Sequence, residues 1–267
     1  MEKNKLTNKF KYKVSLALSG GGSRGIFHLG FIEALQENGV QIKAISGSSV
    51  GSIIGAIISC GIKPRDALII LKSKEFRNIF KFNWFYKSLF RVNLDAKILD
   101  KLFVFKNLKD TKIPFFSSAI DYNTHEILYF NKGDAKKFIY ASCAFYPLFS
   151  PIKYKNFILA DSGLINFIPI KPLLNFNYPI IEINIIPDYT SQKYSFKFIF
   201  VKLYRFLISA KITTNIKKGT WYIAPKEISK FKIFSFNKFQ EKFDLGYKYG
   251  KRWCAKNLSN DLIQFSI

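Results

Sequence analysis

Two short glycine motifs, each between a strand-like and a helix-like segment, constrain this chain more than any other feature. Residues 20–25 have the sequence GGGSRG, and residues 47–51 have the sequence GSSVG. Strands that alternate with helices in this way form parallel sheets, and the turns after the strands gather at one edge. The sequence therefore predicts an α/β fold in which both motifs lie together at that edge.

The first motif joins a strand predicted over residues 12–18 to a helix predicted over residues 26–38, which ends at Gly39. Glycine allows the backbone to take positive φ angles and to approach a ligand closely. The helix N-terminus behind the loop adds a partial positive charge. The loop therefore favours an oxyanion or a phosphate as its ligand.

The second motif places Ser49 between a strand predicted over residues 40–46 and a helix predicted over residues 50–59. A Gly-x-Ser-x-Gly turn of this kind exposes the serine hydroxyl above the sheet, which makes Ser49 a candidate nucleophile. Small residues recur on one side of the following helix and predict close packing on the sheet: Gly51, Gly55 and Ser59.

A dinucleotide site is the alternative interpretation of the first motif, because Gly20, Gly22 and Gly25 also fit a G-x-G-x-x-G pattern. Such sites need an acidic residue about 20 positions further on, at the end of the second strand. Residues 45–47 have the sequence ISG and supply no acid there. The two motifs together favour an acyl-transfer site over a nucleotide site.

The third candidate is Asp161, which follows the apolar run FILA and precedes a glycine-containing turn. This pattern predicts a carboxylate carried on a buried strand. Asp66 and Asp121 are interpreted as capping or solvated groups. Of the two histidines, His28 is interpreted as a packing or hydrogen-bonding residue and His125 as an exposed residue of a hairpin turn.

These motifs resemble those of the patatin-like phospholipase family. The family motif G-G-G-x-R/K-G matches residues 20–25, and G-x-S-x-G matches residues 47–51. The third family motif, D-G-G or D-G-A, aligns with residues 161–163. Weaker family-like stretches follow the expected order, at residues 113–134, 140–152 and 242–253.

The resemblance implies a three-layer α/β sandwich with a mostly parallel central sheet flanked by helices. It implies a lipid acyl hydrolase of phospholipase A or lysophospholipase type, with Ser49 as nucleophile and Asp161 as base, and no cofactor or metal ion. It also implies an oxyanion hole formed by Gly20, Gly21, Gly22, Ser23, Arg24 and Gly25, and a nucleophile elbow flanked by Gly47 and Gly51.

One position departs from the family pattern, because Ser162 follows Asp161 where glycine is usual. If that glycine normally allows an unusual φ angle or a close approach, serine would displace the carboxylate, and a shift of about 1 Å can cost roughly a hundredfold in rate. Ser162 therefore keeps open a second interpretation, in which the chain is a catalytically weak patatin-like protein with a lipid-binding or regulatory role. Arg24 is interpreted as a partner of a substrate phosphate or of a structural salt bridge, and Ser48 as a packing residue.

Length and composition predict a single domain over residues 14–267 that follows a basic tail, residues 1–13. The chain has neither an apolar run of about 18 residues nor a signal-peptide core, which predicts a cytoplasmic protein. The cysteines are odd in number, lack metal-ligand spacing and predict a reducing compartment; they are Cys60, Cys143 and Cys254.

A net charge of +24 predicts an anionic partner. Residues 76–91 and 194–211 combine basic and aromatic residues, a composition typical of helices at a membrane interface. We interpret residues 76–91 as a lid or membrane-docking segment that contacts lipid through Trp84, Phe85, Lys81 and Lys87. In the alternative interpretation both segments are core helices whose lysines extend to water.

Nucleic-acid binding is the rival explanation of the charge, since basic and aromatic residues also suit phosphate backbones and base stacking. The chain contains no recognisable nucleic-acid module, and its charge is spread along its length. The sequence therefore predicts a phospholipid or lysophospholipid substrate on an anionic membrane surface, without a specific nucleic-acid partner.

Overall fold

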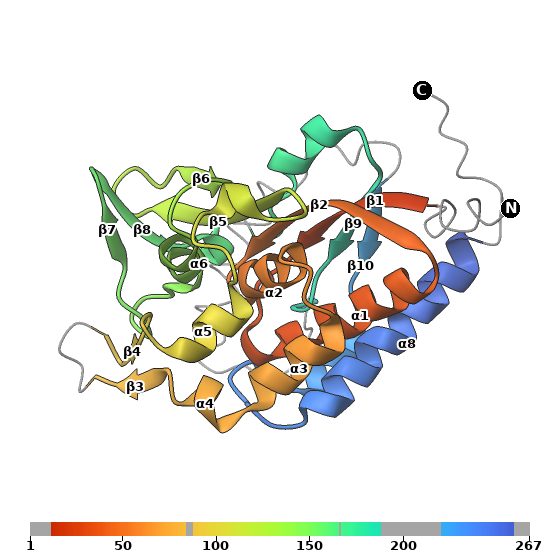
Figure 1. The fold of residues 1–267 in the computed structure, drawn as a ribbon, viewed down its shortest axis with the longest axis horizontal. Helices are drawn as coiled ribbons and strands as arrows, with labels where there is room; N and C mark the ends of the chain where they lie inside the picture. The colour runs from red at the N-terminus through yellow and green to blue at the C-terminus, as the bar shows by residue number, and fades with distance from the viewer. Residues whose placement is uncertain (1–11, 84–87, 166, 188–219, 259–267) are drawn as a thin grey trace, which may run out of the picture.

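The computed structural model describes residues 12–83, 88–165, 167–187 and 220–258. Its centre is an eight-stranded sheet in the order β10-β9-β1-β2-β5-β8-β7, with β6 paired to β5 (Figure 1). The strands are β1 (Tyr12–Leu18), β2 (Val40–Ser48), β5 (Phe115–Asp121), β6 (Ile127–Phe130), β7 (Ile152–Tyr154), β8 (Phe157–Asp161), β9 (Ile180–Ile183) and β10 (Thr220–Ile223).

The strands from β10 to β5 run parallel, whereas β6, β7 and β8 pair antiparallel. Leu18 at the end of β1 lies opposite Gly47, and Ser48 at the end of β2 lies opposite Ser118 in β5. The carboxyl ends of β1 and β2 therefore meet at one edge of the sheet. This register brings the two glycine motifs together, as the sequence predicts.

Helices cover one face of the sheet, and α1 lies side by side with α8 along that face (Figure 1). On the opposite face, the 3-10 helix η4 packs against β1 and β2. The α-helices are α1 (Ile26–Glu37), α2 (Val50–Ser59), α3 (Pro64–Lys72), α4 (Lys74–Arg77), α5 (Lys97–Leu102), α6 (Ala135–Cys143) and α8 (Phe239–Asn257). The 3-10 helices are η1 (Gly22–Gly25), η2 (Leu108–Asp110), η3 (Ser162–Leu164), η4 (Lys171–Phe176) and η5 (Lys226–Lys230).

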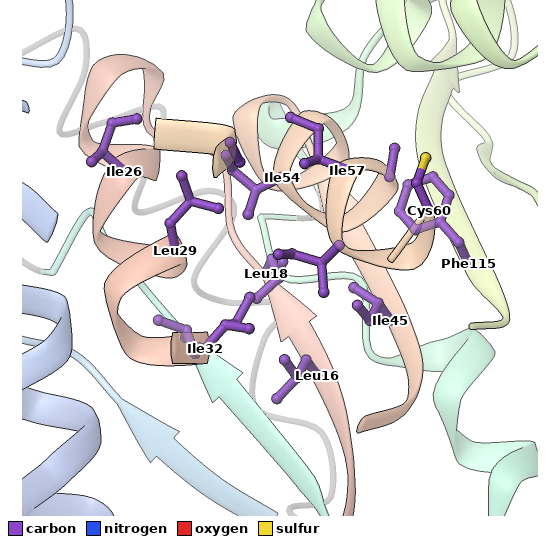
Figure 2. Close-up of a cluster of buried hydrophobic side chains, with 14 of the residues drawn as sticks. Leu16, Leu18, Ile26, Leu29, Ile32, Ile45, Ile54, Ile57, Cys60 and Phe115 are labelled. Atoms are coloured by element: carbon purple, nitrogen blue, oxygen red, sulfur yellow. The ribbon is translucent and has the colours of Figure 1, made fainter. Parts of the chain in front are cut away.

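The alternation of side chains along the strands divides the core into two layers. Leu16 and Leu18 of β1 belong to the large cluster that packs under α1 and α2, as Figure 2 shows. Ala17, between them, belongs to a smaller cluster that includes Leu173 of η4. Burial on both faces explains the apolar strands and confirms the predicted arrangement of a mostly parallel sheet flanked by helices.

The four elements predicted around the motifs are confirmed, with small shifts of their ends. The second strand extends to Ser48, and the first helix ends at Glu37. Strand β1 spans the predicted residues, so Tyr12 and Lys13 belong to it although they also fall in the predicted tail, residues 1–13. The small-residue stripe of α2 also packs as predicted. A Cβ atom on Gly55 would lie 2.7 Å from the ring of Phe115.

The expectation of a helix over residues 76–91 is wrong. Helix α4 ends at Arg77, and β3 (Phe80–Phe82) pairs with β4 (Phe90–Val92) in a separate antiparallel ribbon. Alternating aromatic and basic residues fit the two-residue period of a strand, which explains the difference. Lys81 is exposed on β3. Three of the predicted docking residues, Trp84, Phe85 and Lys87, and all of residues 194–211 lie outside the described residues.

In the described part of the chain, no helix combines the length and the apolar character that crossing a membrane requires.

Candidate active site

Ser49 lies at the sharp turn between β2 and α2, with φ 54° and ψ −126°. A non-glycine residue adopts a positive φ only under constraint from its surroundings. Here the constraint is close packing, because a Cβ atom on Gly47 would lie 2.2 Å from the carbonyl oxygen of Gly51. The backbone amide of Ser49 donates a hydrogen bond to the hydroxyl of Ser142, at 2.9 Å. These contacts hold Ser49 in a sharp turn between a strand and a helix.

The glycine loop lies directly beside the serine. A Cβ atom on Gly20 would lie 3.1 Å from the Cβ and 3.8 Å from the Oγ of Ser49. Gly21 has φ 146° and Gly22 has φ 54°, values that favour glycine. Among the described residues, the backbone amides of Gly21 and Gly22 donate no hydrogen bond, which leaves them available to an anion.

The next two amides of the loop are already in use. The amide of Ser23 donates to the carbonyl oxygen of Ile233 at 2.7 Å, and that of Arg24 donates to the carbonyl oxygen of Gly21 at 3.2 Å. Within the predicted set, residues 20–25, the amides of Ser23 and Arg24 are therefore paired, and those of Gly21 and Gly22 stay candidates for binding an anion.

Asp161 ends β8 and is only 4% exposed. Its Oδ1 accepts a hydrogen bond from the backbone amide of Gly163 at 2.7 Å. Burial raises the pKa of Asp161 to about 6, although hydrogen bonds from Gly163 and from the Ser49 side chain lower it in part. The structure thus brings Ser49 and Asp161 together although they are far apart in the sequence.

The turn after Asp161 holds Ser162 without an unusual φ angle. Ser162 begins η3, and among the described residues it is not one of those with positive φ. Its buried hydroxyl lies 2.7 Å from the hydroxyl of Ser118 and 3.2 Å from that of Ser48. Ser118 in turn donates to the carbonyl oxygen of Gly47 at 3.1 Å. Ser48 and Ser162 therefore join a hydroxyl cluster that connects the Asp161 turn to the elbow.

Arg24 is buried, and its guanidinium donates to backbone carbonyl groups. The acceptors are Phe231 at 2.7 Å, Ile185 at 3.3 Å and Ser229 at 3.3 Å. These contacts give Arg24 a structural role through carbonyl groups, whereas the sequence offered a substrate phosphate or a structural salt bridge as its partner. The sequence did not predict these carbonyl partners, because the residues that supply them belong to no recognisable motif.

The histidines lie as predicted. His28 is fully buried, its Nε2 lies 3.1 Å from the carbonyl oxygen of Ser19, and burial lowers its pKa to about 4. His125 is exposed in the turn between β5 and β6.

Asp121 caps that turn and accepts a hydrogen bond from the amide of Ile158 at 3.0 Å. The described residues contain no cluster of three or more His, Cys, Asp or Glu side chains that could hold a metal ion.

An almost entirely apolar pocket borders the site. Cys143 in its wall follows Ser142 in the sequence, and burial together with the nearby Asp161 raises the pKa of this thiol. Ile53, one turn after Ser49 in α2, also contributes to the wall. The other lining residues are Phe76, Ile79, Phe80, Val92, Leu94, Leu99, Phe103, Lys136, Ile139, Tyr140 and Phe149.

The sequence model of the family described as "Patatin-like phospholipase" matches residues 16–174. This range contains the glycine loop, the elbow and Asp161. The chain belongs to the patatin-like phospholipase family. The matched range ends before residues 229–237, where two of the carbonyl groups that Arg24 contacts lie.

Several curated proteins are similar to this chain. The patatin-like phospholipase domain-containing protein ZK370.4 of Caenorhabditis elegans is 25% identical, over 93% of this chain and 21% of its own length. Lysophospholipase NTE1 of Coccidioides immitis is 25% identical, over 91% of this chain and 18% of its own length. The chain therefore spans about a fifth of the length of the curated relatives it matches.

Among solved structures, VipD from Legionella pneumophila aligns with a TM-score of 0.48 and 15% identity, over 88% of this chain and 67% of that chain.

Proposed function

We propose that this protein is a serine lipid acyl hydrolase of phospholipase A or lysophospholipase type, in which Ser49 attacks the ester and Asp161 is its base. The observation that carries the proposal is the position of the Ser49 side chain beside the buried carboxylate of Asp161, whose pKa burial raises to about 6. Such a carboxylate is ionised at neutral pH and yet a stronger base than an exposed aspartate. Membership of the patatin-like family supports a phospholipid or lysophospholipid substrate.

In the proposed mechanism Asp161 accepts the hydroxyl proton as the Oγ of Ser49 attacks the ester carbonyl carbon. The amides of Gly21 and Gly22 donate hydrogen bonds to the oxyanion that forms. Protonated Asp161 then returns the proton to the departing alkoxide, which leaves as a lysolipid or an alcohol. Water attacks the acyl-enzyme with Asp161 again as base, and Asp161 then passes the proton to the Oγ of Ser49 as the fatty acid leaves.

The apolar pocket supports an acyl chain as the ligand on this side of the site. Its walls are apolar except for Lys136 and Tyr140, and they include Ile53, one turn after Ser49 in α2. Each methylene that an acyl chain buries there contributes about 0.8 kcal/mol. A straight hydrocarbon chain therefore suits this pocket better than a polar group does.

The proposal is tested by fatty-acid release from vesicles of phosphatidylcholine and phosphatidylglycerol, with p-nitrophenyl butyrate as a soluble ester. We expect Ser49→Ala and Asp161→Asn each to lose at least ~1,000-fold on both substrates, because either change removes a reacting group. Asp66→Asn, on the exposed first turn of α3, is the matched control and should keep full activity. Activity of Ser49→Ala within tenfold of wild type would remove the serine mechanism.

The proposal includes docking on an anionic membrane through an aromatic surface that comprises Phe80, Phe82, Phe90, Phe149, Phe234 and Phe236. The ring of Phe80 lies 6.1 Å from that of Phe236 and 6.0 Å from that of Phe149. Phe82 is 49% exposed, Phe234 61% and Phe236 44%. Exposed aromatic residues on adjoining loops are typical of a membrane-contacting surface.

The charges of the β3–β4 ribbon favour an anionic lipid at this surface. Lys81 and Arg91 are exposed and lie directly opposite each other in the ribbon. Two like charges in this position repel each other, and an anionic headgroup between them would relieve the repulsion.

Docking is tested by cosedimentation with the same vesicles. We expect Phe82→Ser combined with Phe236→Ser to weaken vesicle binding about 30-fold, since each ring contributes on the order of 1 kcal/mol of interfacial burial. Turnover of p-nitrophenyl butyrate should stay unchanged, because neither ring lines the apolar pocket. Ile69→Ser, which alters an apolar side chain that is 68% exposed on α3, is the control. Equal loss of binding and of soluble-ester turnover would contradict docking.

The remaining sequence-based expectations stay predictions. They are a single domain over residues 14–267, a reducing cytoplasmic location, catalysis without a cofactor, and no specific nucleic-acid partner.

A further inference from the structure

Lys242 lies in the first turn of α8 and is a cation that is 0% exposed. Its Nζ donates hydrogen bonds to the hydroxyl of Ser23 at 2.9 Å and to the carbonyl oxygens of Ser235 at 2.7 Å and Asn237 at 2.9 Å. These bonds use all three N–H groups of an ammonium. Burial, and secondarily the charge of Arg24, lower the pKa of Lys242 to about 8, so it is still charged at neutral pH.

The two carbonyl groups belong to the strap, residues 229–237, which lies on the glycine loop. The amide of Ser23 donates to the carbonyl oxygen of Ile233 at 2.7 Å, and the hydroxyl of Ser23 donates to that of Lys232 at 3.3 Å. A Cβ atom on Gly22 would lie 2.5 Å from the carbonyl oxygen of Ile233. The strap therefore contacts the loop next to the amides that are free to bind an anion.

Helix α8 is itself held rigidly against α1, which begins directly after the glycine loop. A Cβ atom on Gly30 of α1 would lie 1.9 Å from the carbonyl oxygen of Phe243, the residue after Lys242. A Cβ atom on Gly246 would lie 2.0 Å from the carbonyl oxygen of Phe27. The ammonium therefore extends from a fixed helix to both the strap and the loop.

From this geometry we propose that Lys242 is a positioning residue for the glycine loop. Its ammonium ties Ser23 to the strap, and so keeps the amides of Gly21 and Gly22 in place beside Ser49. This inference rests on the proposed function, because the group that is positioned is the oxyanion site of the hydrolase. Lys242 contacts these groups only through Ser23 and the strap, so its loss should lower kcat and change KM little.

The test compares the full-length variants Lys242→Met, Ser23→Ala and their combination on p-nitrophenyl butyrate. Rates are normalised to the amount of serine that a fluorophosphonate labels, so that misfolded protein is not counted. We expect Lys242→Met to lower kcat about 30-fold with KM within about threefold, somewhat less than the loss of one oxyanion donor. Ser23→Ala should lower kcat about fivefold, and the double variant should match Lys242→Met because both changes break one link. Lys248→Met, an exposed lysine of the same helix, is the control.

A kcat of labelled Lys242→Met within about threefold of wild type would overturn the proposal, as would independent losses that multiply in the double variant. If Lys242→Met yields no labelled protein, Ser23→Ala decides, because it leaves both strap carbonyl bonds of Lys242 in place. A fivefold loss of kcat then supports the proposal, and an unchanged kcat overturns it. Failure of the proposed function itself looks different: wild type would not label, or labelling would survive Ser49→Ala.

Discussion

The surroundings of Asp161 and of Lys242 show two outcomes of burying a charge. Asp161 is 4% exposed and Lys242 is 0% exposed, and burial shifts each pKa toward the neutral form, to about 6 and about 8. Asp161 accepts a hydrogen bond from the backbone amide of Gly163 and lies beside the Ser49 side chain. Lys242 donates all its N–H groups to fixed acceptors.

The difference lies in how completely each charge is compensated. A carboxylate with few donors stays basic and can take a proton from its neighbour. An ammonium whose three N–H groups all donate hydrogen bonds links the segments that carry its acceptors. When the ammonium is removed, these buried acceptors lose their hydrogen-bond donors. The same physical cost of burial therefore accompanies a proposed catalytic base in one region and a proposed positioning residue in the other.

The largest expected contrast is in stability. Asp161→Asn should raise the free energy of unfolding at about pH 8 by up to about 3 kcal/mol, because the carboxyl pKa rises from 3.8 to about 6 on folding. The native state binds this proton more tightly, so its stabilising contribution is complete below pH 3.8 and is lost as pH rises through about 6. Lys242→Met should lower the free energy of unfolding by about 2 kcal/mol, since three acceptors lose their donor.

Urea unfolding of both variants at about pH 4 and about pH 8 measures this contrast. The gain of Asp161→Asn should be present at the higher pH and absent at the lower one. A stabilised Lys242→Met would show that the cost of burying the ammonium exceeds the value of its hydrogen bonds, and would remove the contrast.

The next effect is an acid limb in the pH profile of kcat/KM. Asp161 must be ionised to act as a base, so activity should be full above about pH 7 and fall about tenfold per pH unit below a pKa of about 6. Turnover of p-nitrophenyl butyrate between pH values of about 4.5 and 8 reports this limb. Lys242→Met should leave the limb in place while lowering the plateau. A limb near pH 4 would indicate a base other than this buried carboxylate.

The smallest expected effect is that of Ser162→Gly. The change removes a hydroxyl that lies 2.7 Å from that of Ser118 and 3.2 Å from that of Ser48, but it relieves no positive φ. We expect kcat to stay within about threefold of wild type on p-nitrophenyl butyrate, since one neutral hydrogen bond contributes about 1 kcal/mol or less. A gain of tenfold or more would show that serine at this position weakens the enzyme after all.

The local geometry of the site was predictable from the sequence. Gly47 and Gly51 are required because any side chain there would overlap neighbouring backbone, and this need is visible as a motif. Two strand-to-helix turns in succession also determine that the glycine loop and Ser49 share one edge of a parallel sheet. The position of Asp161 at the end of an apolar run likewise predicted its burial.

Only the tertiary structure decided the rest. Lys242 and Ser23 are 219 residues apart, and neither lies in a pattern that predicts their contact. The ribbon formed by β3 and β4 replaced an expected helix, and the φ angle at Ser162 removed an expected strain. A motif reports backbone geometry over a few residues, because at those positions a larger side chain would overlap neighbouring atoms. The burial of a charge and the pairing of its hydrogen bonds depend on segments that meet only when the whole chain folds.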